Sequence, residues 1–111
     1  MINLKQKYYD ELRKIFDDYC PNAVIWAYGS RVNGDSHSGS DLDLVVKNFN
    51  EKDKYLYELR ELLNDSDIPF LIEIQEYDRL PKSFQEEINK NYVEIYPDFN
   101  ETNTNSWGYE L

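Results

Sequence analysis

Apolar residues recur every three or four positions near the start of the chain, and Lys, Asp and Glu fill the gaps between them. This spacing places the apolar side chains on one side of a helix and predicts an amphipathic helix over residues 2–19 that ends at Pro21 and Asn22. The same periodicity predicts a second amphipathic helix over residues 50–64. A shorter helix is expected over residues 78–91, with Pro81 near its start.

Short apolar runs rich in β-branched and aromatic residues predict strands between these helices. Residues 23–28 (AVIWAY) predict a strand that is buried on both faces, and residues 42–46 predict a second strand. Residues 70–75 (FLIEIQ) predict a third strand, and residues 92–96 a short closing strand or extended segment.

The connection between the first two strands has the composition of turns. Gly29 ends the first strand, and the Ser30 hydroxyl is expected to cap a short helix that begins near Arg31. Residues 33–39 (NGDSHSG) predict a turn. Within it, His37 is expected to be a solvated surface residue.

The order helix, strand, helical turn, strand, helix, strand, helix predicts a small α/β (α+β) domain, in which helices pack on a small mixed β-sheet. A chain of 111 residues with 41% hydrophobic residues can form one modest core. We expect this domain to occupy residues 1–96. Residues 97–111 are polar and are expected to form a flexible tail, in which Trp107 and Tyr109 could dock.

The charge and the cysteine content narrow the class of protein. A net charge of −10 disfavours a broad nucleic-acid surface, so no direct nucleic-acid binding is expected, whereas it suits a basic protein partner. The single cysteine, Cys20, is expected to be a structural thiol in a reducing compartment. Without a signal peptide or a membrane-spanning apolar run, we expect a cytoplasmic protein.

Three acidic residues suggest a metal site. Asp41 and Asp43 are two residues apart in a strand-like run, so their side chains project to the same side and repel each other unless a cation lies between them. Magnesium prefers such carboxylate oxygens. Glu73 lies between two isoleucines and can join the pair if the second and third strands are neighbours. Each feature alone also has an ordinary explanation, as a solvated loop or an edge-strand charge.

The combination of Gly29-Ser30-Arg31, Gly34 and residues 40–44 (SDLDL) resembles the signature of the DNA polymerase beta-like nucleotidyltransferase superfamily. The compact length resembles the minimal nucleotidyltransferases (MNT), the MntA-type antitoxins of HEPN/MNT toxin–antitoxin pairs. The resemblance extends from the first helix to Tyr96 and implies the polymerase beta-like nucleotidyltransferase fold.

The resemblance also implies roles for individual residues. Gly29 and Ser30 would hold the β- and γ-phosphates of ATP, the substrate. Arg31 and Ser40 are further candidates for nucleotide binding, and Arg31 could instead pair with an acid or serve a structural role.

The three acids, Asp41, Asp43 and Glu73, would be the catalytic residues and would bind two Mg²⁺ ions. The family commonly has Asp where this chain has Glu73.

The implied activity is Mg²⁺-dependent transfer of AMP from ATP to a hydroxyl. The acceptor favoured by the resemblance is a tyrosine of a HEPN-type toxin, which the protein would neutralise as an antitoxin. Two alternatives remain open: a small-molecule nucleotidyltransferase of the aminoglycoside-modifying kind, and an antitoxin that acts only by binding. A homo- or hetero-oligomer is compatible with each of them.

Overall fold

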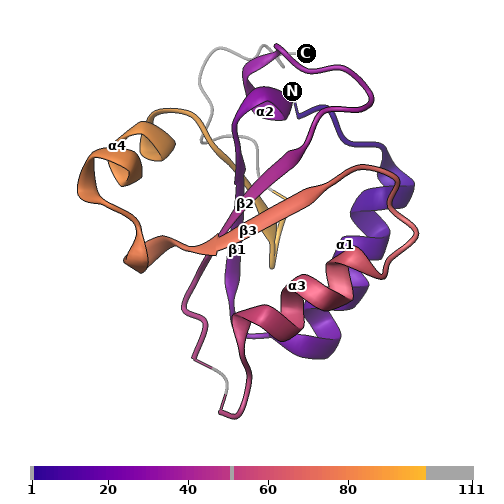
Figure 1. Cartoon of the computed structure of the whole chain (residues 1–111), viewed down its shortest axis with the longest axis vertical. Coiled ribbons are helices and arrows are strands. Elements are labelled where there is room, and N and C mark those ends of the chain that lie inside the picture. The colour runs from indigo at the N-terminus through magenta and orange to yellow at the C-terminus, as the bar shows by residue number, and fades with distance from the viewer. Residues whose placement is uncertain (1, 51, 100–111) are drawn as a thin grey trace.

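The computed structural model describes residues 2–50 and 52–99 (Figure 1). The elements follow the predicted order, and their bounds are α1 Gln6–Tyr19, β1 Val24–Tyr28, α2 Ser30–Asn33, β2 Leu42–Lys47, α3 Leu56–Asn64, β3 Ile72–Glu76, the 3-10 turn η1 Tyr77–Arg79, α4 Lys82–Lys90 and β4 Val93–Tyr96. The predicted docking of Trp107 and Tyr109 lies outside the described residues.

Three helices are shorter than the sequence pattern predicts. α1 begins at Gln6 rather than at residue 2, and α3 begins at Leu56 rather than at residue 50. Asp53, just before α3, has a left-handed φ of 61°, a conformation that a helix cannot include. α4 begins only at Lys82, because Pro81 is extended and separates it from η1.

The four strands form one mixed sheet in the order β3-β2-β1-β4. β1 pairs antiparallel with β2 and β4, whereas β2 and β3 are parallel and are connected through α3. In this register Tyr28 lies opposite Asp43, and Asp43 lies opposite Glu73. The prediction of a small mixed sheet with helices packed on it is confirmed.

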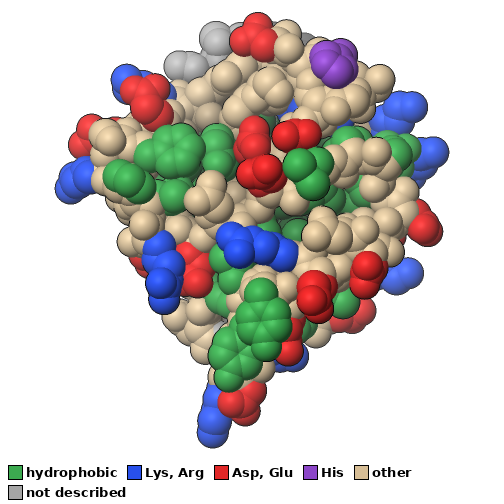
Figure 2. Space-filling view, in the orientation of Figure 1, with side chains coloured by type: hydrophobic (Ala, Val, Ile, Leu, Met, Phe, Trp, Pro, Cys, Tyr) green, Lys and Arg blue, Asp and Glu red, His purple; other side chains and the backbone are tan. Residues whose placement is uncertain are grey.

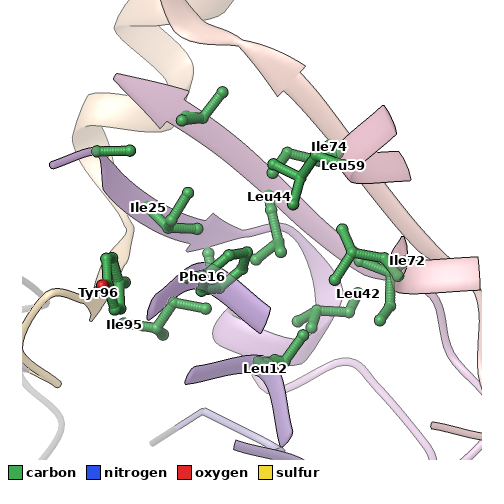
Figure 3. Close-up of a cluster of buried hydrophobic side chains, with 14 of the residues drawn as sticks. Leu12, Phe16, Ile25, Leu42, Leu44, Leu59, Ile72, Ile74, Ile95 and Tyr96 are labelled. Atoms are coloured by element: carbon green, nitrogen blue, oxygen red, sulfur yellow. The ribbon is translucent and has the colours of Figure 1, made fainter. Parts of the chain in front are cut away.

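The main hydrophobic core lies between the sheet and the helix pair α1 and α3, which cover the same face (Figure 1). Figure 3 shows Leu12 and Phe16 of α1 pointing at the sheet, with side chains from every strand around them. Cys20 is fully buried at the end of α1, as expected of a structural thiol.

The opposite face of the sheet is covered less completely. α4 and η1 pack there through Ile88 and Tyr77 against Val45. The prediction that β1 is buried on both faces is therefore only half right: Ile25 and Ala27 are buried, but Val24, Trp26 and Tyr28 are half-buried. This partly open face is the one that carries Asp43, because Leu42 and Leu44 point into the main core.

Within the residues that the structure describes, no helix combines the length and the apolar character needed to cross a membrane.

Candidate active site

The turn after β1 depends on a glycine. Gly29 has φ +84°, and its carbonyl oxygen accepts hydrogen bonds from the backbone N–H groups of Val32 and Asn33, each at 2.9 Å. Gly29 therefore occupies the capping position and α2 begins at Ser30 itself. The prediction that the Ser30 hydroxyl caps this helix is wrong, since no side-chain capping hydrogen bond is present at this described terminus.

Gly29 also lies directly beside the Asp43 carboxylate. A Cβ atom placed on Gly29 would come within 2.5 Å of Asp43 Oδ2, closer than any real contact of that kind. The turn and the carboxylate can approach this closely only because residue 29 has no side chain. The two halves of the sequence signature, the glycine turn and the Asp pair, thus meet at the end of the β1–β2 ladder.

Two of the three predicted acids lie on adjacent strands, and the third directly precedes one of these strands. β2 and β3 are neighbours, and Asp43 and Glu73 are directly paired in register. Asp41 is exposed and lies one residue before β2, while Asp43 is half-buried and Glu73 is exposed. The adjacency on which the prediction for Glu73 depended is therefore present.

The surroundings of Asp43 disfavour the ionised form of its carboxyl group. Burial raises the pKa of the Asp43 carboxyl above its usual value, and the negative charges of Glu73 and Asp41 raise it further. Within residues 2–50 and 52–99, no three His, Cys, Asp or Glu side chains are placed to hold a metal ion as they stand. The acids are thus close enough to repel one another without forming a ready-made cage.

Tyr28 is a member of the site that the sequence analysis did not select. Its side chain lies opposite Asp43, and burial raises the pKa of the Tyr28 phenol, as do the charges of Asp43 and Glu73. A hydrogen bond with the Gln75 side chain acts in the opposite direction. Its position directly before the glycine turn, at the end of a strand, was the available signal.

Arg31 is only 2% exposed. Its guanidinium donates to three backbone carbonyl oxygens, those of Asn3 at 2.7 Å, Ser38 at 2.9 Å and Ser40 at 2.9 Å. It also lies 3.8 Å from the centre of the Phe70 ring. Burial lowers the pKa of Arg31, and the charge of Asp41 acts against this shift. These contacts support the structural alternative for Arg31.

The loop before Asp41 is held by short-range hydrogen bonds. The Ser40 hydroxyl accepts from the backbone N–H of His37 at 3.0 Å, and the Gly39 N–H donates to His37 Nδ1 at 3.1 Å. His37 is exposed, as predicted. Ser30 and Ser40 are both half-buried at the edge of the site, and their predicted contacts with a nucleotide stay predictions.

A mixed sheet with a glycine turn beside an acidic residue is the arrangement expected of a nucleotidyltransferase, and the comparison with known families agrees with this class of protein. The profile of the family described as "Polymerase beta, Nucleotidyltransferase" matches residues 10–100. The chain belongs to this family and is a nucleotidyltransferase with the polymerase beta-like fold.

One relative and one solved structure refine this assignment. The chain is 30% identical over 99 residues to the "Probable protein adenylyltransferase MntA" of Haemophilus influenzae, a match that covers 85% of this chain and 83% of that protein. A chain in the "Crystal structure of the toxin-antitoxin with AMP-PNP" superposes with a TM-score of 0.60 at 20% identity, covering 79% of this chain and 72% of that one. The latter likeness concerns the fold.

Proposed function

We propose that this nucleotidyltransferase transfers AMP from ATP to a hydroxyl of a partner protein in a Mg²⁺-dependent reaction. The observation that carries the proposal is that Gly29, directly after β1, lies against Asp43 of β2, which is paired in register with Glu73 of β3. The favoured acceptor is a tyrosine of a HEPN-type toxin whose gene is adjacent to the gene of this protein. Both proteins would act in the cytoplasm, and the transfer would be an antitoxin activity. The similarity to a protein named as a probable protein adenylyltransferase supports a protein as the acceptor.

The chemistry of the acids fits magnesium. Asp41, Asp43 and Glu73 offer only carboxylate oxygens, the ligands that this hard cation prefers. Burial first, and then the negative charges of Glu73 and Asp41, raise the pKa of Asp43, and a divalent cation bound there would offset both effects. When bound, Mg²⁺ would neutralise the phosphates and polarise the reacting oxygens. The carboxylates would have to turn toward the ion, because they do not converge as they stand.

The reaction balances without any further reagent. The acceptor oxygen forms a bond to the α-phosphorus of ATP, and the bond between that phosphorus and the α–β bridging oxygen breaks. Pyrophosphate leaves from the side of the Gly29-Ser30 turn, and the hydroxyl proton passes to the carboxylate of Glu73. The protein contributes position and charge rather than a covalent intermediate.

The deciding experiment is an incubation of the protein with α-labelled ATP and MgCl₂, with and without the protein encoded by the adjacent reading frame. Label is expected on a tyrosine of that protein, located by mass spectrometry. It should be absent with EDTA and absent with Asp41→Ala or Asp43→Ala. Asp18→Ala, an exposed acid on α1, removes the same charge and should label normally.

Other results would redirect the assignment. Full neutralisation of a toxic partner by Asp43→Ala without any label would show an antitoxin that acts by binding. Label on an aminoglycoside, and none on the partner, would show the small-molecule alternative. Absence of Mg²⁺-dependent ATP binding in calorimetry would contradict both enzymatic assignments.

A further inference from the structure

The open edge of β3 is the part of the surface from which the proposed chemistry expects the acceptor hydroxyl to approach. β3 is the terminal strand of the order β3-β2-β1-β4, so in the described residues no strand covers its outer side. Figure 1 views the molecule from this side, with β3 in front of β2 and β1. Figure 2, in the same orientation, shows acidic and hydrophobic side chains close together on this face.

The direction of approach follows from the order of the strands. In an in-line displacement the attacking and leaving oxygens lie on opposite sides of the phosphorus. The turn proposed for the leaving phosphates follows β1, Asp43 is on β2, and Glu73 is on β3. Neighbouring strands are about 5 Å apart. With pyrophosphate on the β1 side of Asp43, the hydroxyl must therefore arrive from the β3 side.

An open groove of about 430 Å³ lies along this edge, between β3 and α3. Glu73 is one of the residues that line it, so a group bound there lies along the strand that carries the proposed proton acceptor. Arg60 of α3 also lines the groove, and its guanidinium donates to the backbone carbonyl of Ile74 at 3.0 and 3.1 Å. These hydrogen bonds fix one wall of the groove.

One large apolar side chain lines the groove, a second lies on the side of α3 that lines it, and both are exposed to solvent. Leu71, which lines it directly, is 50% exposed. Tyr57 is 59% exposed and lies on the same side of α3 as Arg60 and Asn64, because positions three and seven residues apart share one side of a helix. We call the groove together with Leu71 and Tyr57 the acceptor surface.

We propose that the acceptor surface docks a polypeptide segment of the partner protein, which presents its hydroxyl to Glu73 across the edge of β3. This proposal rests on the proposed function. The exposed leucine and tyrosine suit apolar side chains of a protein better than a polyhydroxylated small molecule. The net charge of −10 favours a partner segment with basic side chains around that hydroxyl.

The test measures the dissociation constant of the protein from the adjacent reading frame for charged variants of the surface. Leu71→Glu and Tyr57→Glu are each expected to raise this constant by at least about tenfold. ATP affinity should change less than about twofold, which shows that the nucleotide site is intact. Leu62→Glu is the matched control, since Leu62 is 42% exposed on the same helix but on another side of it.

The outcomes separate this proposal from the proposed function. Unchanged partner binding by both variants, equal weakening by Leu62→Glu, or no binding of that partner by the wild type would overturn the acceptor surface. If the variants weaken binding as expected but the wild type transfers no label, the surface stands and AMP transfer fails. If label reaches the partner and both variants label it as efficiently as the wild type, AMP transfer stands and the surface is wrong.

Discussion

At the scale of single residues, Gly29 is the position at which the backbone and the chemistry are most tightly linked. Its left-handed φ and its contact with Asp43 both exclude a side chain. We expect Gly29→Ala to destabilise the fold by about 1–3 kcal/mol and to abolish measurable ATP binding, because the turn or the carboxylate must move. Urea unfolding and calorimetry measure the two effects.

Gly39→Ala provides the comparison for this prediction. Gly39 has no left-handed φ, and an added Cβ would make an ordinary contact of 3.4 Å with the His37 ring. It should cost less than about 1 kcal/mol and retain ATP binding. Equal effects of the two substitutions would show that the approach of residue 29 to Asp43 has no special importance.

Gly29 is expected to support both stability and ATP binding, whereas Asp43 is expected to support AMP transfer while lowering stability. Its pKa is raised, so the folded state holds this proton more tightly than the unfolded state does. Stability should therefore fall as pH rises from the ordinary carboxyl pKa through the raised one. At pH 7 without Mg²⁺, Asp43→Asn is expected to raise the melting temperature while lowering AMP transfer about 10²–10³-fold.

The control for Asp43→Asn is Asp18→Asn, which changes the net charge equally at an exposed site of α1. A gain in melting temperature of the same size in both variants would assign the effect to net charge. A lower melting temperature for Asp43→Asn would contradict the account in which burial, and then the charges of Glu73 and Asp41, disfavour the ionised form of Asp43.

At the scale of elements, Arg31 connects α2 to the loop before Asp41 and to the N-terminal segment through its hydrogen bonds to Asn3, Ser38 and Ser40. Arg31→Ala leaves three carbonyl groups without their donor and should cost about 2–4 kcal/mol. Arg31→Lys keeps the charge but lacks the forked donor geometry, so it should recover only part of that loss. Chemical denaturation measures both values.

Hydrogen exchange gives this prediction a local readout. Backbone amides of residues 37–40 should exchange faster in Arg31→Ala than in the wild type, because the carbonyls of Ser38 and Ser40 are released. Arg79→Ala is the control, since Arg79 is exposed and forms a surface ion pair with Glu76 at 3.6 Å. It should change stability by less than about 1 kcal/mol.

Sequence patterns predicted the elements well where their signals are local. Helical periodicity and apolar runs gave the order of helices and strands, although helix starts were placed too early at α1, α3 and α4. The error at α3 has a local cause, the left-handed φ of Asp53, that apolar periodicity does not encode. The division into a domain over residues 1–96 and a tail stays a prediction.

At the scale of the whole molecule, one core on one face of the sheet holds the site together. Phe16 of α1 is 1% exposed and contacts the ring of Tyr96 at a centroid distance of 5.4 Å. Phe16→Ala should therefore cost about 3–5 kcal/mol and lower the melting temperature by about 10 °C or more. Leu62→Ala, at an exposed position of α3, should cost less than about 1 kcal/mol.

Phe16→Ala should not alter the chemistry of the protein that remains folded, because Phe16 lies on the face of the sheet opposite Asp43. Below its melting temperature, AMP transfer per folded molecule is expected to match the wild type. A selective loss of transfer at full folding would show that α1 positions the carboxylates as well as covering the core.

The sequence by itself determined the class of fold, the glycine turn and the spacing of Asp41 and Asp43, because each depends on residues that are close along the chain. Only the tertiary structure decided that β2 and β3 are parallel neighbours with Asp43 opposite Glu73, that Tyr28 lies opposite Asp43, and that Arg31 is buried and donates to backbone carbonyls. Strand pairing and side-chain burial depend on contacts between distant segments, and local periodicity does not contain that information.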